Sequence, residues 1–520
     1  MSTLRDQLFE EILQARQRVY AVGDVTPLQR LNLPGVEVVV YAKREDLGPI
    51  KAYKWRGAYN CMCKLTAEER AKGVVAASAG NHAQGVALAA RRLGCRAHIF
   101  MPRSTPIVKQ NAVKSHGGEN VEIVLTGDSY DAASAAAHEF AEQQQLTFVH
   151  PYDDLATMGG QGTLADEVVM SGQGSFDRVY LQIGGGGLAA GCACWFKKFW
   201  PECTCIGVEG VKQASMKLAV ETGERRALPY VDVFCDGTAV RVAGKNTYEL
   251  CRDLLDEYVT VTNDEVCQAI RSLWNGLRVV PEPSGAMGLA ALLQDWDAGK
   301  IKSGEKCLVV LSGGNMDFSQ LGVVAARGGV RETNRTLRYL RIPMETKRGQ
   351  IIKYLKHIPE GVQLMDVQFG RLNGDIQHPV FGILGTDEQF AEIETGLAAR
   401  GLSAEDVTND DDVRFRMISY DRVHLSHPVF FVIEFPERPG AFLEFMSGVG
   451  RYANLCYFNY RYSGESVGRA LVGLEFLSLE DRDACRAFAE TMKGTTIQSI
   501  KEMPDRVRRR VLDNMSPMEK

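Results

Sequence analysis

The sequence lacks the features that mark membrane, secreted and nucleic-acid-binding proteins. No apolar run approaches the roughly 18 residues that a membrane-spanning helix needs. The net charge of −5 gives no reason to expect nucleic acid or an acidic membrane surface as a partner. Residues 1–20 mix charged with spaced apolar side chains, which predicts an amphipathic helix and not a signal peptide. We therefore expect a cytoplasmic protein.

The thirteen cysteines lack the spacing of a zinc ribbon. The pairs Cys61/Cys63, Cys192/Cys194 and Cys203/Cys205 are separated by one residue, whereas zinc ribbons use C-x-x-C. Free cysteines in a reducing compartment behave as small apolar residues. We expect most of these thiols to be buried, and we expect no metal site.

The chain is too long for one ordinary domain, and its composition is that of a soluble globular protein. It has 520 residues, of which 45% are hydrophobic and 24% are charged, so two to four domains are expected. Residues 1–322 alternate short apolar runs, such as Ala97–Met101 and Val121–Leu125, with helical stretches. This alternation predicts an α/β domain with mostly parallel sheets covered by helices.

A glycine-rich segment, Gly184–Leu188, lies between a predicted strand at residues 179–183 and a predicted helix at residues 188–199. Backbone N–H groups can converge in such a loop at the positive end of the helix, so it is typical of a phosphate site. A dinucleotide-binding fold is the rival interpretation. Gly185, Gly187 and Ala190 satisfy G-x-G-x-x-A, and Glu209 stands where a ribose-binding acid would.

Three further segments supply groups that the rival leaves unexplained. Lys54 is a candidate Schiff-base lysine, and burial beside Tyr53 and Trp55, with Arg56 as a nearby like charge, would lower its pKa. Ser312 follows another apolar run and offers a neutral hydroxyl to a pyridine nitrogen, which suits elimination better than transamination. Together with the glycine loop, these groups indicate a pyridoxal phosphate site.

The third segment, Ser78–His82, precedes a predicted helix at residues 83–93. Such a loop offers backbone N–H groups to a carboxylate, and the Asn81 amide is placed to reach the ring hydroxyl of the cofactor. An ordinary helix N-cap is the bland alternative. His82 fits a packed, hydrogen-bonded histidine equally well, and we do not assign it a catalytic role.

Six motifs give the chain a resemblance to the biosynthetic threonine dehydratases, pyridoxal phosphate enzymes of fold type II with a tryptophan-synthase-β-like catalytic domain. The resemblance covers nearly the whole chain. The motifs are Lys43–Asp46, Lys54–Ala58, Ser78–Gln84, Gly184–Leu188, Pro281–Ala286 and Ser312–Asn315.

The resemblance implies a role for each segment. Lys54 would carry the cofactor and act as the catalytic base, while Asn81 and Ser312 would bind the ring hydroxyl and the ring nitrogen. The phosphate would lie on Gly184, Gly185, Gly186, Gly187 and Leu188. The substrate would contact Ser78, Ala79, Gly80, Asn81, His82 and Glu282. Two lobes are implied, the smaller at about residues 55–155.

After about residue 318 the pattern changes to two similar halves, at residues 335–410 and 428–503. Each spells β-α-β-β-α-β, the ferredoxin-like order. The second half contains Pro436, Glu437, Arg438, Pro439 and Gly440, which resemble the first turn of an amino-acid-binding ACT domain. The corresponding turn of the first half, Met344–Gly349, is two residues longer and lacks the second proline. A purely structural or dimerising pair of domains is the alternative.

The resemblance implies the conversion of L-threonine to 2-oxobutanoate and ammonia, the first step of isoleucine biosynthesis. L-serine would be a secondary substrate, L-isoleucine the effector, and a homotetramer the assembly. Other fold-type-II reactions (serine racemisation, threonine synthesis or cysteine synthesis) and a non-catalytic amino-acid sensor remain as alternatives.

Overall fold

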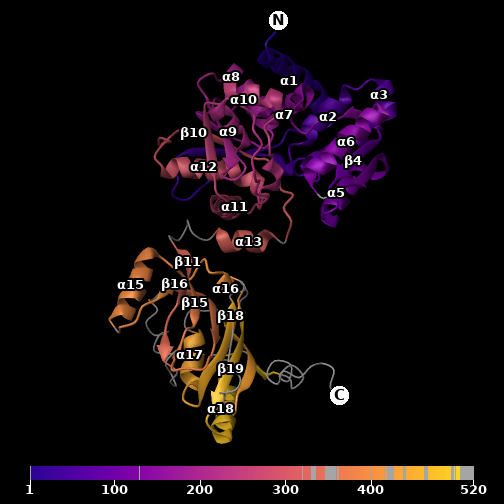
Figure 1. The fold of residues 1–520 in the computed structure, drawn as a ribbon. Coiled ribbons are helices and arrows are strands. Elements are labelled where there is room, and N and C mark those ends of the chain that lie inside the picture. Colours follow the sequence, from indigo (N-terminus) through magenta and orange to yellow (C-terminus); the bar gives the residue numbers. More distant parts are fainter. Residues whose placement is uncertain are drawn as a thin grey trace, which may run out of the picture. The chain divides into compact units, whose positions relative to one another are not determined.

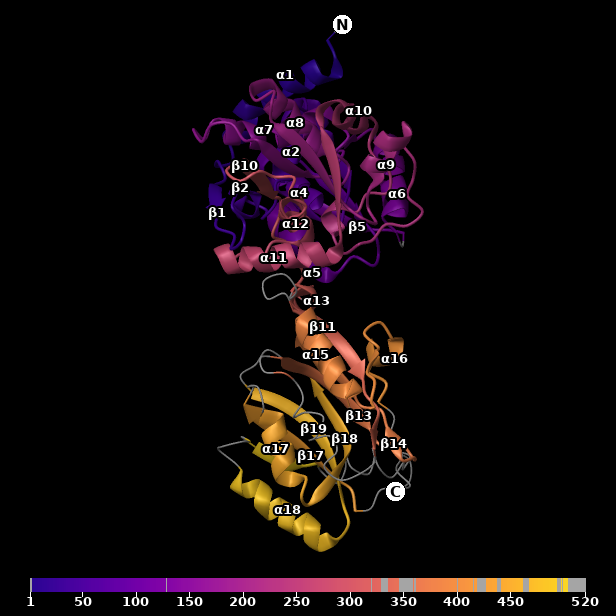
Figure 2. The same ribbon diagram turned by 90° about the vertical axis from the view of Figure 1, so that its left-hand side faces the viewer.

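The computed structural model describes residues 2–127, 129–318, 320–328, 335–345, 359, 362–399, 401–414, 416–418, 427–436, 441–461, 467–492, 497 and 499–503. The chain divides into two compact units, Met1–Gly328 and Gly329–Lys520 (Figures 1 and 2). The first ends just after helix α13 (Gln320–Arg327), whereas the sequence pattern predicts an α/β domain over residues 1–322.

The larger lobe of the first unit is built on a six-stranded sheet of order β1-β2-β10-β7-β8-β9. Its strands are parallel except β1, which pairs antiparallel with β2. The strands are β1 (Leu28–Leu31), β2 (Val39–Arg44), β7 (Arg178–Gln182), β8 (Thr204–Gly210), β9 (Glu257–Val261) and β10 (Lys306–Leu311).

Helices cover both faces of this sheet. Alternate residues of each strand point to opposite sides, and apolar side chains stand on both sides, so each face needs a cover. Leu308 and Val310 of β10 pack with the helices of one face, and Val309 and Leu311 pack with those of the other. The first face carries α1 (Leu4–Tyr20), α7 (Leu155–Val169), α8 (Gly187–Phe199), α9 (Ser215–Thr222) and α10 (Lys245–Leu254). The second carries α11 (Asn263–Leu277) and α12 (Pro283–Asp297).

The smaller lobe has a four-stranded parallel sheet of order β5-β4-β3-β6. Figure 1 shows its elements gathered on one side of the unit, away from α8, α10 and α12. The strands are β3 (Val74–Ala77), β4 (Ala97–Met101), β5 (Val121–Leu125) and β6 (Thr147–Phe148). The helices of this lobe are α2 (Trp55–Cys63), α3 (Ala67–Lys72), α4 (Asn81–Leu93), α5 (Ile107–Gly117) and α6 (Tyr130–Gln144). The N-terminal unit as a whole also contains the 3₁₀ turns η1 (Glu45–Leu47), η2 (Gly118–Asn120) and η3 (Asp236–Thr238).

The C-terminal unit contains one eight-stranded sheet of order β16-β11-β15-β13-β18-β19-β17-β20. Each half contributes four strands, and β13 pairs antiparallel with β18 where the halves meet. The strands are β11 (Thr336–Arg341), β13 (Gln363–Gly370), β15 (Val380–Gly385), β16 (Glu405–Asp406), β17 (Val429–Pro436), β18 (Ala453–Arg461), β19 (Val467–Phe476) and β20 (Ser499–Glu502). A short pair, β12 (Met344–Glu345) and β14 (Ile376–Gln377), lies outside this sheet.

The described helices of this unit are α15 (Asp387–Ala398), α16 (Asp411–Arg414), α17 (Ala441–Val449) and α18 (Leu479–Thr491). Figure 2 shows α17 and α18 together on one face of the sheet. Both halves bury side chains in one shared core, which contains Val367, Phe381, Phe458 and Val472. The α/β fold with a tail of α+β domains, predicted from the sequence, is therefore confirmed.

Some predictions for the C-terminal unit fall outside the described residues. Pro436 ends β17, but Glu437–Gly440 of the candidate effector turn are not described, and neither are residues 346–349 of the corresponding turn in the first half. These remain predictions.

Two further features concern the apolar character of the helices and the burial of the cysteines. Within the described ranges, no helix is both long and apolar enough to cross a membrane. Eleven of the thirteen cysteines are buried, and only Cys61 and Cys63 are partly exposed.

Candidate active site

Lys54 is held beside Ser312 by backbone pairing between two segments that are far apart in the sequence. The Tyr53 N–H donates to the Ser312 carbonyl oxygen at 3.1 Å, and the Gly314 N–H donates to the Lys51 carbonyl at 2.8 Å. Between these bonds, Ala52 and Gly313 form an antiparallel bridge. Lys54 itself is the N-cap residue of α2. The candidate amine and the candidate ring-nitrogen partner thus share one small piece of backbone.

The pKa of the Lys54 amine lies below the ordinary value for lysine. Burial lowers its pKa to about 8, against the opposing charge of Glu282. The prediction that Arg56 lowers this pKa is wrong, because that guanidinium is neutralised by two carboxylates. Its Nε lies 2.9 Å from Glu45, and its Nη1 lies 2.5 Å from Glu167. A charge compensated in this way has little net effect on its neighbours.

Asn81 is fixed between the two lobes by its side-chain amide. Its Nδ2 donates to Glu282 Oε1 at 2.8 Å, and its Oδ1 accepts from Asn315 Nδ2 at 2.8 Å. Asn315 also donates to the Ile50 carbonyl at 2.8 Å. Asn81 begins α4, two residues before the predicted start, and Gly80 is the N-cap. The amide therefore lies between Glu282, which accepts from its nitrogen, and Asn315 of the Ser312 loop, which donates to its oxygen.

Glu282 is a buried carboxyl group whose pKa is raised to about 7 by burial and by the charge of Asp236. Hydrogen bonds from Asn81 and from the backbone of Asn315, together with Lys54, act in the opposite direction. Glu282 is therefore able to hold or release a proton near neutral pH.

His82 is buried, and burial lowers its pKa to about 3, so the ring is neutral. Because the Val149 carbonyl, 2.9 Å away, can only accept, Nε2 carries the proton. This geometry fits the packed, hydrogen-bonded histidine that was one of the two interpretations of the sequence.

The Ser78–Asn81 segment is partly exposed between a buried strand and a buried helix, as a substrate-facing loop should be. The Ser78 hydroxyl accepts from the Gly80 N–H at 3.2 Å and so stabilises the turn. The helix N-terminus that follows favours a negative group such as a carboxylate.

The tetraglycine loop joins β7 to α8, and its glycines are needed for close packing. A Cβ at Gly185 would lie 2.1 Å from Cγ of Tyr152, and Gly186 has φ +96°, which favours glycine. The first-turn N–H groups of α8 have no acceptor within the helix. Among the described residues, none accepts a hydrogen bond from the backbone N–H groups of Gly184–Leu188. Such a cradle suits a phosphate.

The turn η3 connects the glycine loop to Glu282. A Cβ at Gly184 would lie 3.0 Å from Cα of Thr238, and one at Gly237 would lie 3.4 Å from Glu282 Oε1. The structure therefore brings the four predicted segments together, linked directly or through the turn η3 and Glu282.

Glu209 lacks the free carboxylate that the dinucleotide alternative requires. Its two oxygens accept from the backbone N–H groups of Met216 and Lys217, at 2.9 and 2.8 Å, at the start of α9. This structural role accounts for Glu209 and argues against a ribose site.

Two residues near the site, Tyr152 and Thr238, were missed by sequence reasoning, and a third, Asn315, stood in a motif but was given no role. Tyr152 packs against Gly185 of the glycine loop, and Thr238 packs against Gly184. Asn315 donates to the Asn81 side chain and so orients it. Tyr152 follows the short strand β6 in the run His150–Asp154, a polar cluster after a strand that could have drawn notice. Thr238 had no comparable signal.

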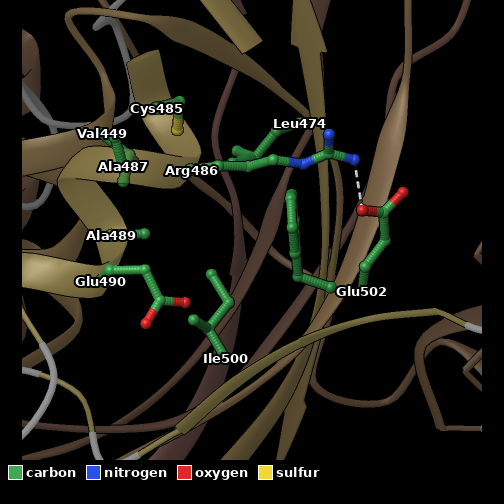
Figure 3. Close-up of a pocket in the computed structure, with 10 residues that line it drawn as sticks. Val449, Leu474, Cys485, Arg486, Ala487, Ala489, Glu490, Ile500 and Glu502 are labelled. Atoms are coloured by element: carbon green, nitrogen blue, oxygen red, sulfur yellow. Dashed lines mark hydrogen bonds and ion pairs between the residues drawn. The ribbon is translucent and has the colours of Figure 1, made fainter. Parts of the chain in front are cut away.

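A separate hollow of about 300 Å³ lies in the C-terminal unit (Figure 3). Phe431, Val449, Leu474 and Ile500 form its apolar wall. Figure 3 shows Arg486 of α18 paired across it with Glu502 of β20. Because this ion pair already engages Arg486, we assign no ligand to the hollow.

The residues in the N-terminal unit fit pyridoxal phosphate on the basis of their chemistry. They provide a partly accessible amine of lowered pKa, a neutral hydroxyl, an amide, and a glycine cradle whose N–H groups no described residue accepts. The site is thus that of a pyridoxal-phosphate-dependent enzyme, and residues 21–313 match the family model of that description. Residues 421–512 match the C-terminal regulatory domain of threonine dehydratase.

Whole-chain comparisons give the same result. The biosynthetic L-threonine dehydratase of Haemophilus influenzae is 37% identical over 485 residues, which is 92% of this chain and 93% of that protein. The chain therefore belongs to the biosynthetic threonine dehydratase family. The solved structure of the processed form of threonine deaminase isoform 2 from Solanum lycopersicum is 40% identical (TM-score 0.59), covering 62% of this chain and 94% of its own. Maize serine racemase is 30% identical (TM-score 0.56), covering 61% and 96%.

Proposed function

We propose that this chain catalyses the dehydration and deamination of L-threonine to 2-oxobutanoate and ammonia, with pyridoxal phosphate carried by Lys54. The observation that supports this most is the placement of Lys54 against the Ser312 loop, with Asn81 and Glu282 opposite. The family membership and the relatives named as threonine dehydratases support the choice of substrate.

Each group has a role in the proposal. The cofactor, when bound, supplies an electron sink that acidifies the α-proton of the amino acid. Lys54, neutral above about pH 8 and partly neutral below it, takes that proton. The Ser78–His82 loop holds the substrate carboxylate through the N–H groups of Ala79, Asn81 and His82, since those of Ser78 and Gly80 already donate within the protein. The Asn81 side chain fixes the ring hydroxyl. Ser312 offers the ring nitrogen a neutral hydroxyl, which favours elimination over transamination.

The β-hydroxyl leaves as water, and later hydrolysis of the enamine product releases ammonia and 2-oxobutanoate. L-serine enters the same route, because one methyl group changes binding by only about 1–3 kcal/mol. Serine racemisation is the nearest alternative, since maize serine racemase shares the fold at 30% identity. Chiral analysis of the products separates the two reactions.

Replacement of Lys54 tests the catalytic assignment. Lys54→Ala should abolish both 2-oxobutanoate formation and the visible absorbance of the lysine-bound cofactor. Lys72→Ala, which changes an exposed lysine at the end of α3, should leave both intact. Unchanged absorbance in Lys54→Ala would assign the cofactor to another amine.

The regulatory part of the proposal rests on the C-terminal match. L-isoleucine would bind this unit, with Pro436, Glu437, Arg438, Pro439 and Gly440 as the candidate contact turn, and would reduce activity in a homotetramer. Open strand edges and the broad sheet face of such domains favour docking between copies. Equilibrium dialysis of the full chain with labelled isoleucine, compared with Gly440→Val, tests the turn directly.

A further inference from the structure

The motif Lys43–Asp46 and the residue Arg56 have no part in the chemistry proposed so far. The structure brings them together with Glu167 in one buried cluster, which we call the buried quartet: Lys43, Glu45, Arg56 and Glu167. Their side chains are between 0% and 1% exposed. Two positive and two negative charges balance in this interior.

Arg56 is saturated with partners. Its Nε and Nη2 donate to Glu45 at 2.9 Å each. Its Nη1 and Nη2 donate to Glu167 at 2.5 and 3.0 Å, and Nη1 also donates to the Thr163 hydroxyl at 3.1 Å. The planar guanidinium is therefore locked in orientation, as a lysine at this position would not be.

Three further hydrogen bonds complete the cluster. Lys43 Nζ donates to Glu167 at 2.5 Å and to the Thr26 carbonyl at 2.6 Å. The Thr26 hydroxyl donates to Glu45 at 2.5 Å. Burial acts to raise the pKa of Glu45, but Arg56 and Lys43 more than offset it, so the pKa lies below its usual value and the carboxyl stays charged.

The location of the cluster points to its role. It ties strand β2, the turn η1 and helix α7 to the first turn of α2, which begins immediately after Lys54. On the other side of Lys54, residues 51–53 are bonded to residues 312–314. The backbone of Lys54 is thus held from both directions, by the buried quartet and by the Ser312 loop.

Stability alone explains such a cluster poorly. A buried ion network is often no more stabilising than apolar residues of the same volume, because desolvating the charges offsets their attraction. Hydrogen bonds of fixed direction, however, restrict geometry in a way that apolar packing does not.

We propose that the buried quartet is a positioning device for the reactive amine, with Arg56 setting the distance and direction of Lys54 relative to Ser312. The proposal rests on the proposed function, in which Lys54 carries the cofactor. Arg56 touches neither substrate nor cofactor in this account and acts only through the backbone of α2.

The test measures how fast the full-length apoprotein captures pyridoxal phosphate, followed by visible absorbance, next to thermal unfolding. Three variants perturb the cluster: Arg56→Lys, and the isosteric Thr26→Val and Thr163→Val. Asp295→Asn is the matched control, because Asp295 is fully buried and holds Lys300 and Tyr180 at 3.0 and 3.1 Å without contacting α2. Borohydride reduction and peptide mapping of the unsubstituted protein identify the lysine used.

We expect Arg56→Lys to slow capture by about 100-fold and each threonine variant by about tenfold, since small misplacements of reacting groups have effects of this size. Asp295→Asn should lose stability but capture at the normal rate. If the cluster variants lose stability like the control and still capture normally, the positioning role is wrong. If Arg56→Lys does not fold, the threonine variants decide. Mapping to another lysine would instead overturn the assignment of Lys54.

Discussion

At the scale of single residues, the chemistry depends on two groups that titrate near neutrality. Burial lowers the pKa of Lys54 to about 8, and burial raises that of Glu282 to about 7. Only the neutral amine attacks an aldehyde. The rate of cofactor capture by the apoprotein should therefore rise with pH and level off above a midpoint near 8, measured by stopped-flow absorbance. A flat profile from pH 6 to 10 would contradict the lowered pKa.

Glu282 gives a second prediction for the pH midpoint of cofactor capture, because its negative charge favours the protonated form of Lys54. Glu282→Gln removes that charge, so the midpoint of capture should move to lower pH. Glu209→Gln is the control, since Glu209 is also a buried carboxyl group of raised pKa but is not among the groups that act on Lys54. A shift to higher pH in Glu282→Gln would refute the assigned interaction.

At the scale of secondary-structure elements, the loop between β7 and α8 has room for a ligand only if its glycines stay unsubstituted. A Cβ at Gly185 would overlap the Tyr152 ring at 2.1 Å. Gly185→Ala should therefore displace the loop and weaken pyridoxal phosphate binding by about 100-fold, measured by fluorescence titration. Gly322→Ala in α13, where a Cβ meets nothing within 4 Å, should bind normally. Equal affinities would show that the loop is not the phosphate cradle.

The two lobes are also linked by an ion pair between elements. Lys109 of α5 lies 2.5 Å from Asp236 of η3, the turn that touches both the glycine loop and Glu282. Lys109→Met should raise KM for threonine by up to about fivefold, since partly exposed ion pairs contribute about 0.2–1 kcal/mol. Arg96→Met, which breaks a pair with Glu122 inside the smaller lobe, should leave KM unchanged. Steady-state kinetics at low salt distinguish them.

The elements differ in how far the sequence predicted them. The strands and glycine loops were predictable because their signals are local, as at Gly184–Leu188. The start of α4 was placed two residues late, since Asn81 and His82 carry no helix signal of their own. The pairing of residues 51–53 with 312–314 was beyond reach, because contacts so distant in sequence leave no local pattern. For Arg56 the charge was visible, but its partners Glu45 and Glu167 were not.

At the scale of the whole molecule, catalysis and regulation are assigned to separate compact units. The unit Met1–Gly328 has its own sheets and its own hydrophobic cores, so we expect it to fold alone. Truncation after Gly328 should therefore keep threonine turnover and lose inhibition by isoleucine. Inhibition that persists in the truncated protein would place the effector site in the catalytic unit.

In the proposed function, this chain dehydrates threonine under the control of its C-terminal unit. The most direct test measures 2-oxobutanoate formation from L-threonine by the purified full-length protein, with and without L-isoleucine. We predict turnover that requires pyridoxal phosphate and falls when isoleucine is added. Absence of 2-oxobutanoate in the cofactor-loaded protein would contradict the proposed reaction, and turnover unaffected by isoleucine would contradict the proposed control.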